Sequence, residues 1–172
     1  MSEPIYRGAS LSLKGGDNHH QAAQAYHLVD SAGSPLGVTA LDLEDLGAQA
    51  RLMGWTNVGD AQGVLFATTS LGQRCNAYFG PERKVHMAIS SKHTRPVAVG
   101  YGTTQQEAFI KMFLGDVNSP FGGFFGFNHP LEPETAALMN GMMFEGVVAA
   151  GYEDGADELL ASTDKGRDKR NK

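Results

Sequence analysis

The sequence predicts an α+β fold, with a mainly antiparallel sheet and two or three helices packed on one face. Three observations lead to this class. Short stretches of alternating apolar residues are separated by glycine-rich turns, which is typical of antiparallel strands. A capped amphipathic helix directly follows one of these stretches. The 172 residues are 41% hydrophobic and 19% charged, a composition that supports one ordinary globular core.

Alternation and β-branched content locate the expected strands. A turn at Gly15 to Asn18 and a loop at residues 31–35 separate the first of them. Asp42 is placed to cap a helix over residues 42–54, whose apolar residues lie on one face. The predicted strands are residues 5–13, 25–29, 36–41, 64–69, 74–79, 84–90 and 95–101.

Residues 95–115 carry the clearest local signal. Thr104 stands three residues before Glu107, the spacing of a capping box, in which each side chain satisfies a backbone N–H of the first helical turn. Gly115 is a natural end for this helix. Its apolar stripe consists of Ala108, Phe109, Met112 and Phe113. This stretch therefore predicts a strand, a tight turn and a helix.

The C-terminal part predicts a loop, a helix and a tail. Residues 118–130 are rich in glycine and phenylalanine and predict a loop. Pro133 suits the first turn of a further helix that extends to about Ala150. Residues 151–172 lose hydrophobicity. We therefore expect a single α+β domain over residues 1–150 and a polar, disordered tail over residues 151–172.

Charge, cysteine content and motifs limit the classes of function. The formal net charge of −5 is mild and does not indicate a surface devoted to nucleic acid. Cys75 is the single cysteine, which indicates a reducing compartment, and we expect a cytoplasmic protein without a membrane span. No spacing of histidine, cysteine or carboxylate residues matches a metal motif, and no cofactor motif is present. We therefore expect neither metal nor cofactor.

The main functional prediction is a small, non-enzymatic accessory protein that acts through protein–protein contact. Four phenylalanines among glycines, followed by a methionine-rich helix, suit an adaptable contact surface. The partner would be another protein or a second copy in a homodimer. Phages and plasmids encode such proteins, including inhibitors of host systems. The predicted contact residues are Phe121, Phe124, Phe125, Phe127, Met139, Met142 and Met143.

A nucleic-acid-binding domain is the first alternative. The predicted order between residues 42 and 115 is α-β-β-β-α, and the final turn carries Gly100, Gly102, Thr103, Thr104, Glu107 and Ala108. In these features the segment resembles the double-stranded RNA-binding domain, which implies contacts to phosphates. Gln105 and Gln106 stand where that family has lysines. The basic residues available for the contact are Arg74, Arg83, Lys84, Lys92 and Arg95.

An enzyme with an unfamiliar site is the second alternative. No known catalytic motif marks it, so candidates come from residue type alone. Asp60, His86 and His93 are the residues that we would replace first.

Overall fold

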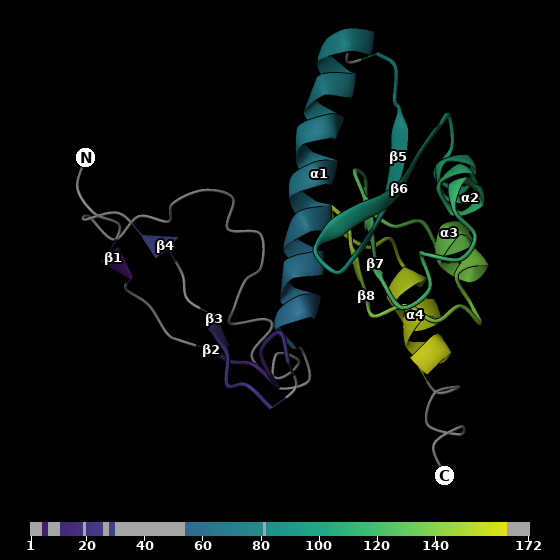
Figure 1. Cartoon of the computed structure of the whole chain (residues 1–172). Helices are drawn as coiled ribbons and strands as arrows, with labels where there is room; N and C mark the ends of the chain where they lie inside the picture. Colours follow the sequence, from purple (N-terminus) through teal and green to yellow (C-terminus); the bar gives the residue numbers. More distant parts are fainter. Residues whose placement is uncertain are drawn as a thin grey trace.

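A mixed four-stranded sheet forms the centre of the described part of the chain. The computed structural model describes residues 5–6, 11–18, 20–25, 28–29, 54–80 and 82–164. The strand order is β6-β5-β7-β8, where β5 pairs antiparallel with β6 and β7, and β7 pairs parallel with β8 (Figure 1). The strands are β5 (His86–Lys92), β6 (Arg95–Gly102), β7 (Phe124–Phe127) and β8 (Gly146–Val148). The α+β class is thus confirmed, but the sheet is mixed rather than mainly antiparallel.

Helices cover both faces of this sheet, which corrects the prediction of helices on one face. The long helix α1 (Trp55–Phe79) lies on one face, and α2 (Gln105–Gly115), α3 (Pro133–Leu138) and α4 (Ala156–Asp164) lie on the other (Figure 1). Nearer the N-terminus, short strands form two further antiparallel pairs. These pairs are β1 (Ile5–Tyr6) with β4 (Leu28–Val29) and β2 (Leu11–Ser12) with β3 (Gln24–Ala25).

Strand β7 divides the core into two clusters because its side chains alternate between the two faces. Phe124 packs with Ala61 and Val64 of α1. Phe125 and Phe127 point the other way and belong to the larger cluster beneath α2 and α3. All four residues of β7 are buried, so the glycine- and phenylalanine-rich segment is a central strand rather than only a loop.

Helix α1 replaces the two strands predicted at residues 64–69 and 74–79. Its buried residues include Ala61, Val64, Thr68 and Gly72, which recur every three or four positions, as one face of a helix does. The Thr68 hydroxyl donates to the carbonyl of Val64 at 2.9 Å, so this buried polar group is satisfied within the helix. Packing on β7 therefore outweighs the local strand preference of the β-branched residues.

The predicted capping box at the start of α2 is confirmed, with one difference. The Thr104 hydroxyl accepts from the Glu107 amide at 3.1 Å. The Glu107 carboxylate accepts from the amide of Thr103 at 2.7 Å, one residue before the cap. Hydrogen bonds from Lys111 first, and then from Thr103, lower the pKa of Glu107 to about 2. The helix continues through Gly115, which is its last residue.

The C-terminal predictions need correction. The helix that begins at Pro133 ends at Leu138 rather than near Ala150, and strand β8 follows. Gly141, in the turn between them, has a φ of 84°, a left-handed value that glycine adopts without steric cost. The predicted disordered tail begins with ordered residues, because Ala156 at the start of α4 is fully buried in the core.

Several predictions from the N-terminal third cannot be compared with the structure. The strand at residues 36–41 and the helix at residues 42–54 lie outside the described residues, apart from Gly54. In the described part of the chain, no helix has the length and apolar character that a membrane span requires.

Candidate functional site

A polar cavity of about 420 Å³ lies where the start of α1 meets the hairpin between β5 and β6. It is walled by side chains from distant parts of the sequence, including Trp55, Asn57, Asp60, Lys92, His93 and Glu145. Its volume falls within the range of small-molecule sites, and several polar side chains line it. We therefore build the candidate site around it.

The turn between β5 and β6 is the unusual backbone feature of this cavity. His93 and Thr94 have φ values of 57° and 63°, and they are the non-glycine residues with positive φ in the described part of the chain. A two-residue hairpin loop that matches sheet twist needs positive φ at both positions, and Asn-Gly or Asp-Gly normally supplies it. A β-branched residue such as Thr94 adopts this conformation at a cost of order 1–3 kcal/mol. The turn must therefore be held by its surroundings.

The carboxylate of Asp60 contacts this turn from α1. Its Oδ1 accepts from the Thr94 amide at 2.6 Å and from the Ser91 hydroxyl at 3.0 Å. Its Oδ2 accepts from the His93 amide at 3.1 Å. Asp60 is only 5% exposed, and hydrogen bonds to an ionised group of this kind are stronger than those between neutral groups.

Lys92 and His93 lie side by side at the end of β5. The Lys92 ammonium donates to the carbonyl of Phe121 at 2.8 Å, which ties it to the loop before β7. Both residues line the cavity, and both also line a shallower hollow of about 670 Å³ that includes Arg95 and Ser119. Lys92 and His93 therefore line both hollows, which places a cationic side chain next to an imidazole.

Trp55, Asn57 and Glu145 also line the cavity. The Trp55 side chain is 48% exposed at the start of α1, and its amide donates to the carbonyl of Gly15 at 2.8 Å. This bond holds the predicted turn at residues 15–18 beside the cavity. Asn57 donates through Nδ2 to Glu145 at 3.3 Å and so joins α1 to the segment before β8. The indole presents a flat apolar surface on which a planar ring can stack.

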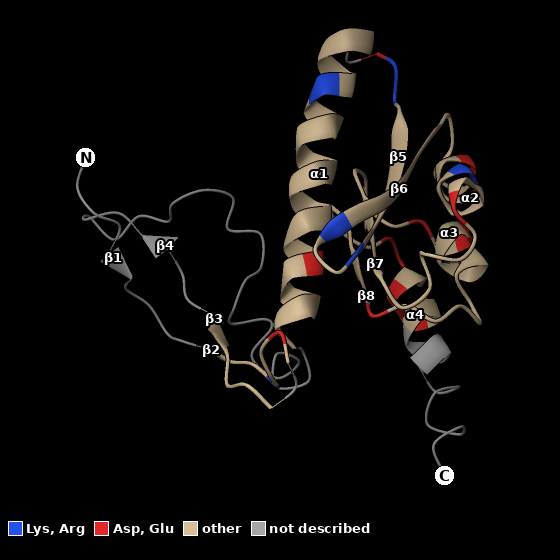
Figure 2. Ribbon diagram, in the orientation of Figure 1, with Lys and Arg blue, Asp and Glu red and all other residues tan. Residues whose placement is uncertain are grey.

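The predicted basic surface is divided in space. Lys92 and Arg95 line the shallower hollow, whereas Arg83 and Lys84 precede the other end of β5, about 20 Å away along the strand (Figure 2). Arg74 lies near the far end of α1, and the Arg83 guanidinium stacks over the Phe79 ring at 5.3 Å. The α-β-β-β-α order behind the resemblance to the double-stranded RNA-binding domain is also absent from the described residues, because α1 occupies two of its strands.

Most of the predicted protein-contact residues belong to the core. Phe124, Phe125, Phe127 and Met139 are buried, and Met142 packs partly buried against the larger cluster. Phe121 and Met143 are exposed, at 39% and 56%. The four aromatic residues therefore do not form an exposed surface together, because β7 turns three of them inward.

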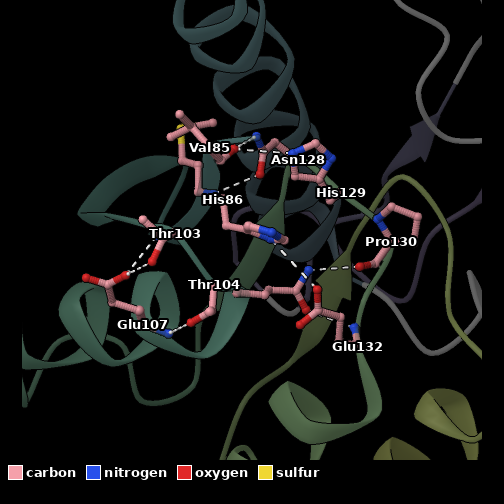
Figure 3. Close-up of polar contacts among 11 residues, drawn as sticks. Val85, His86, Thr103, Thr104, Glu107, Asn128, His129, Pro130 and Glu132 are labelled. Carbon is pink, nitrogen blue, oxygen red and sulfur yellow. Dashed lines mark hydrogen bonds and ion pairs between the residues drawn. The ribbon is translucent and has the colours of Figure 1, made fainter. Parts of the chain in front are cut away.

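His86 lies apart from Asp60 and His93, at the start of β5. Its ring contacts that of His129 with 4.9 Å between centroids, and its Nδ1 lies 3.9 Å from a carboxylate oxygen of Glu132 (Figure 3). Burial first, and then Lys84 and His129, lower the pKa of His86 to about 4. Burial also raises the pKa of Glu132. Because a pKa of about 4 leaves the His86 ring neutral near pH 7, this contact is not an ion pair there.

Hydrogen bonds around His86 connect β5 with the segment after β7. Asn128 accepts from the Met87 amide at 2.8 Å and donates to the carbonyl of Val85 at 2.9 Å (Figure 3). Gln105 donates to the carbonyl of Pro130 and accepts from the Glu132 amide, both at 2.8 Å. The hydrogen bonds of Asn128 and Gln105 therefore join β5 and α2 to the segment after β7.

The lowered pKa of His86 predicts that stability depends on pH. Between pH 6.5 and 4 the unfolded chain takes up a proton at His86 that the folded chain does not. Stability should therefore be fully present above about pH 6.5 and fall as the pH decreases, by at most about 3 kcal/mol from this residue. Urea unfolding at pH 4.5 and 7 measures the difference. His86→Phe should reduce it, and equal differences in both proteins would contradict the assignment.

The fold and the cavity define an α+β domain whose pocket carries a lysine and a histidine suited to anion binding and proton transfer. Comparison with known proteins identifies its relatives. The family model described as the AICARFT/IMPCHase bienzyme matches residues 5–168. The chain belongs to this family.

The curated relatives carry the name "Bifunctional purine biosynthesis protein PurH". The protein from Rippkaea orientalis is 32% identical over 156 residues, which cover 91% of this chain and 27% of the relative. The protein from Chlorobium phaeobacteroides is 31% identical over 150 residues, with 87% and 26% covered. The protein from Gloeothece citriformis is 32% identical over 151 residues, with 88% and 26% covered. The chain spans about a quarter of the length of these relatives.

Family membership corrects the main functional prediction. The relatives are enzymes of purine biosynthesis, so the prediction of a non-enzymatic accessory protein, or of an inhibitor carried by a phage or plasmid, is wrong. The alternative of an enzyme with an unfamiliar site agrees better with the family. Of the three residues named for that alternative, the structure brings Asp60 and His93 together and leaves His86 at the other end of β5.

The predicted enzyme site did not include three of the residues that line the cavity. Lys92 was named for nucleic-acid binding alone, and Trp55 and Glu145 were not named. One sequence feature could have indicated this site. His93 and Thr94 occupy a two-residue hairpin turn that normally requires Gly or Asn. A non-glycine pair at such a position indicates backbone strain held for a function.

Proposed function

We propose that this chain binds a purine-pathway ribonucleotide in the cavity that Lys92 and His93 line. It would thereby contribute to an enzyme of purine biosynthesis. The observation that carries the proposal is the adjacent placement of Lys92 and His93 in a cavity with an aromatic wall. Membership of the AICARFT/IMPCHase bienzyme family supports the choice of ligand.

Each side chain has a role suited to its chemistry. The Lys92 ammonium is a point charge that attracts a phosphate or a developing negative charge. His93 carries the imidazole, the side chain that most often transfers protons in enzymes. The exposed face of Trp55 provides a stacking surface, and stacking of a base on an aromatic ring contributes about 1–3 kcal/mol. The cytoplasmic location stays a prediction, as does contact with another protein or a second copy through Phe121 and Met143.

Calorimetric titration with AICAR and with IMP, the two compounds in the family's name, tests the proposal. Lys92→Met keeps the apolar stem and removes the charge, and it should weaken binding about 10- to 100-fold, because a charge-assisted contact is worth about 1.5–3 kcal/mol. His93→Gln should leave the affinity within about threefold, because the ring acts in proton transfer rather than in holding the ligand.

Lys111→Met is the matched control. Lys111 pairs with Glu107 at 2.7 Å on the surface of α2, away from the cavity. This variant should bind as the wild type does. Equal losses in Lys92→Met and Lys111→Met, or no binding of either nucleotide by the wild type, would refute the proposed site.

A further inference from the structure

The turn at His93 and Thr94 contacts a group outside the hairpin. His93 and Thr94 both have positive φ, which neither residue adopts readily. The turn is exposed, so packing on its outer side does not hold it. Asp60 reaches it from α1 and accepts hydrogen bonds from the His93 and Thr94 amides, as well as from the Ser91 hydroxyl in β5.

The sequence of α1 allows this close contact. A Cβ added at Gly59 would lie 2.5 Å from Cγ2 of Thr94, so a larger residue there would push the turn away from the helix. Asp60 follows directly and is buried. Since its carboxylate lies within a long helix packed on the sheet, its position is fixed independently of the hairpin that it contacts.

We propose that Asp60 is a positioning residue, which holds His93 and Thr94 in the left-handed conformation that presents Lys92 and His93 to the cavity. Its Oδ1 atom accepts hydrogen bonds from the Ser91 hydroxyl and the Thr94 amide, whereas Oδ2 accepts from the His93 amide. The inference rests on the proposed function for its ligand, but the geometry of the turn is measurable without any ligand.

Asp60→Asn replaces one of the two carboxylate oxygens with an NH₂ group and leaves the volume of the side chain almost unchanged. The asparagine oxygen can replace Oδ1, but its NH₂ group then faces the His93 amide, donor against donor. AICAR affinity should fall about tenfold or more, since losing one hydrogen bond to a charged group is worth about 1.5–3 kcal/mol. Glu107→Gln is the matched control. Glu107 also accepts from a backbone amide, that of Thr103, away from the cavity, and this variant should keep wild-type affinity.

A rescue experiment distinguishes positioning from direct ligand contact. Thr94→Gly introduces a residue that adopts positive φ readily. The double variant Asp60→Asn, Thr94→Gly should therefore bind AICAR at least about threefold more tightly than Asp60→Asn alone. Undiminished binding by Asp60→Asn would overturn the inference. Loss of binding without any recovery in the double variant would also overturn it, because Asp60 would then act on the ligand itself.

A ligand-free measurement keeps this test separate from that of the proposed function. The three-bond couplings between the amide and α protons of His93 and Thr94 report φ directly by NMR. We expect them to change in Asp60→Asn, and the His93 coupling to return toward the wild-type value in the double variant. If the wild type binds no nucleotide, the proposed function fails, and these couplings still decide the role of Asp60. Unchanged couplings in Asp60→Asn would refute it.

Discussion

Replacing Phe109 by alanine is expected to lower the free energy of unfolding by about 3–5 kcal/mol. Phe109 is 2% exposed on the inner face of α2. Its ring contacts those of Phe125 and Phe127, with centroid distances of 5.6 and 6.1 Å. Truncation leaves a cavity at the point where α2 meets β7. Urea unfolding, followed by circular dichroism, measures the loss.

Phe66→Ala is the matched control for this prediction. Phe66 is also a helical phenylalanine, but it is 66% exposed on α1. Its truncation should change stability by no more than about 0.5 kcal/mol, as is usual for exposed positions. If the two variants lost similar amounts of stability, the core described beneath α2 would be wrong.

Replacing Gly100 by alanine should be comparably damaging, at about 3 kcal/mol. An added Cβ at Gly100 would overlap the carbonyl oxygen of Ala108 and the amide nitrogen of Met112. Both are backbone atoms of α2, so no side-chain rotation relieves the overlap, and overpacking of this kind costs about 1–3 kcal/mol or more. The same unfolding measurement detects it, together with changed tertiary contacts between α2 and β6.

Gly63→Ala should act in the opposite direction. A Cβ there would lie 3.7 Å from the Ser91 hydroxyl, an ordinary contact, and alanine in a helix interior is favoured over glycine by about 0.8–1 kcal/mol. We therefore expect a stabilised protein. Destabilisation at Gly63, or tolerance of alanine at Gly100, would mean that the helices pack on the sheet differently.

The segment from β6 through α2 was predictable because local rules and tertiary structure agree there. The capping spacing of Thr104 and Glu107, and the apolar stripe that includes Phe109 and Met112, are visible within a dozen residues. Nothing distant needs to be known to place them. The register of Gly100 against α2 then follows from a close contact that only glycine permits.

Helix α1 and strand β7 were not predictable by the same reasoning. Residues 64–69 are β-branched and aromatic, and only their packing on Phe124 and Gly126 selects a helix. A Cβ at Gly126 would overlap Val64, so the glycine that looked like a loop residue is what allows α1 to approach the sheet. The predicted strands in residues 64–79 and the predicted loop at residues 118–130 were therefore wrong together, because α1 and β7 determine each other's structure.

The candidate site was only partly predictable for the same reason. Asp60 and His93 were named as separate candidates, but the hydrogen bond between them spans 33 residues of sequence. It becomes visible only when residue 60 lies on a helix beside the β5–β6 hairpin. The purine-biosynthesis relationship was not accessible from composition or motif spacing, and it came from comparison with complete proteins.

Mapping of AICAR binding by amide chemical shifts tests whether Lys92 and the turn at His93 and Thr94 form a nucleotide site. If they do, the largest shifts occur at residues 92–94, with further shifts at residues 55–57 and 122, which line the same cavity. Shifts concentrated around His86 and His129, at the other end of β5, would show that the nucleotide does not bind at this turn.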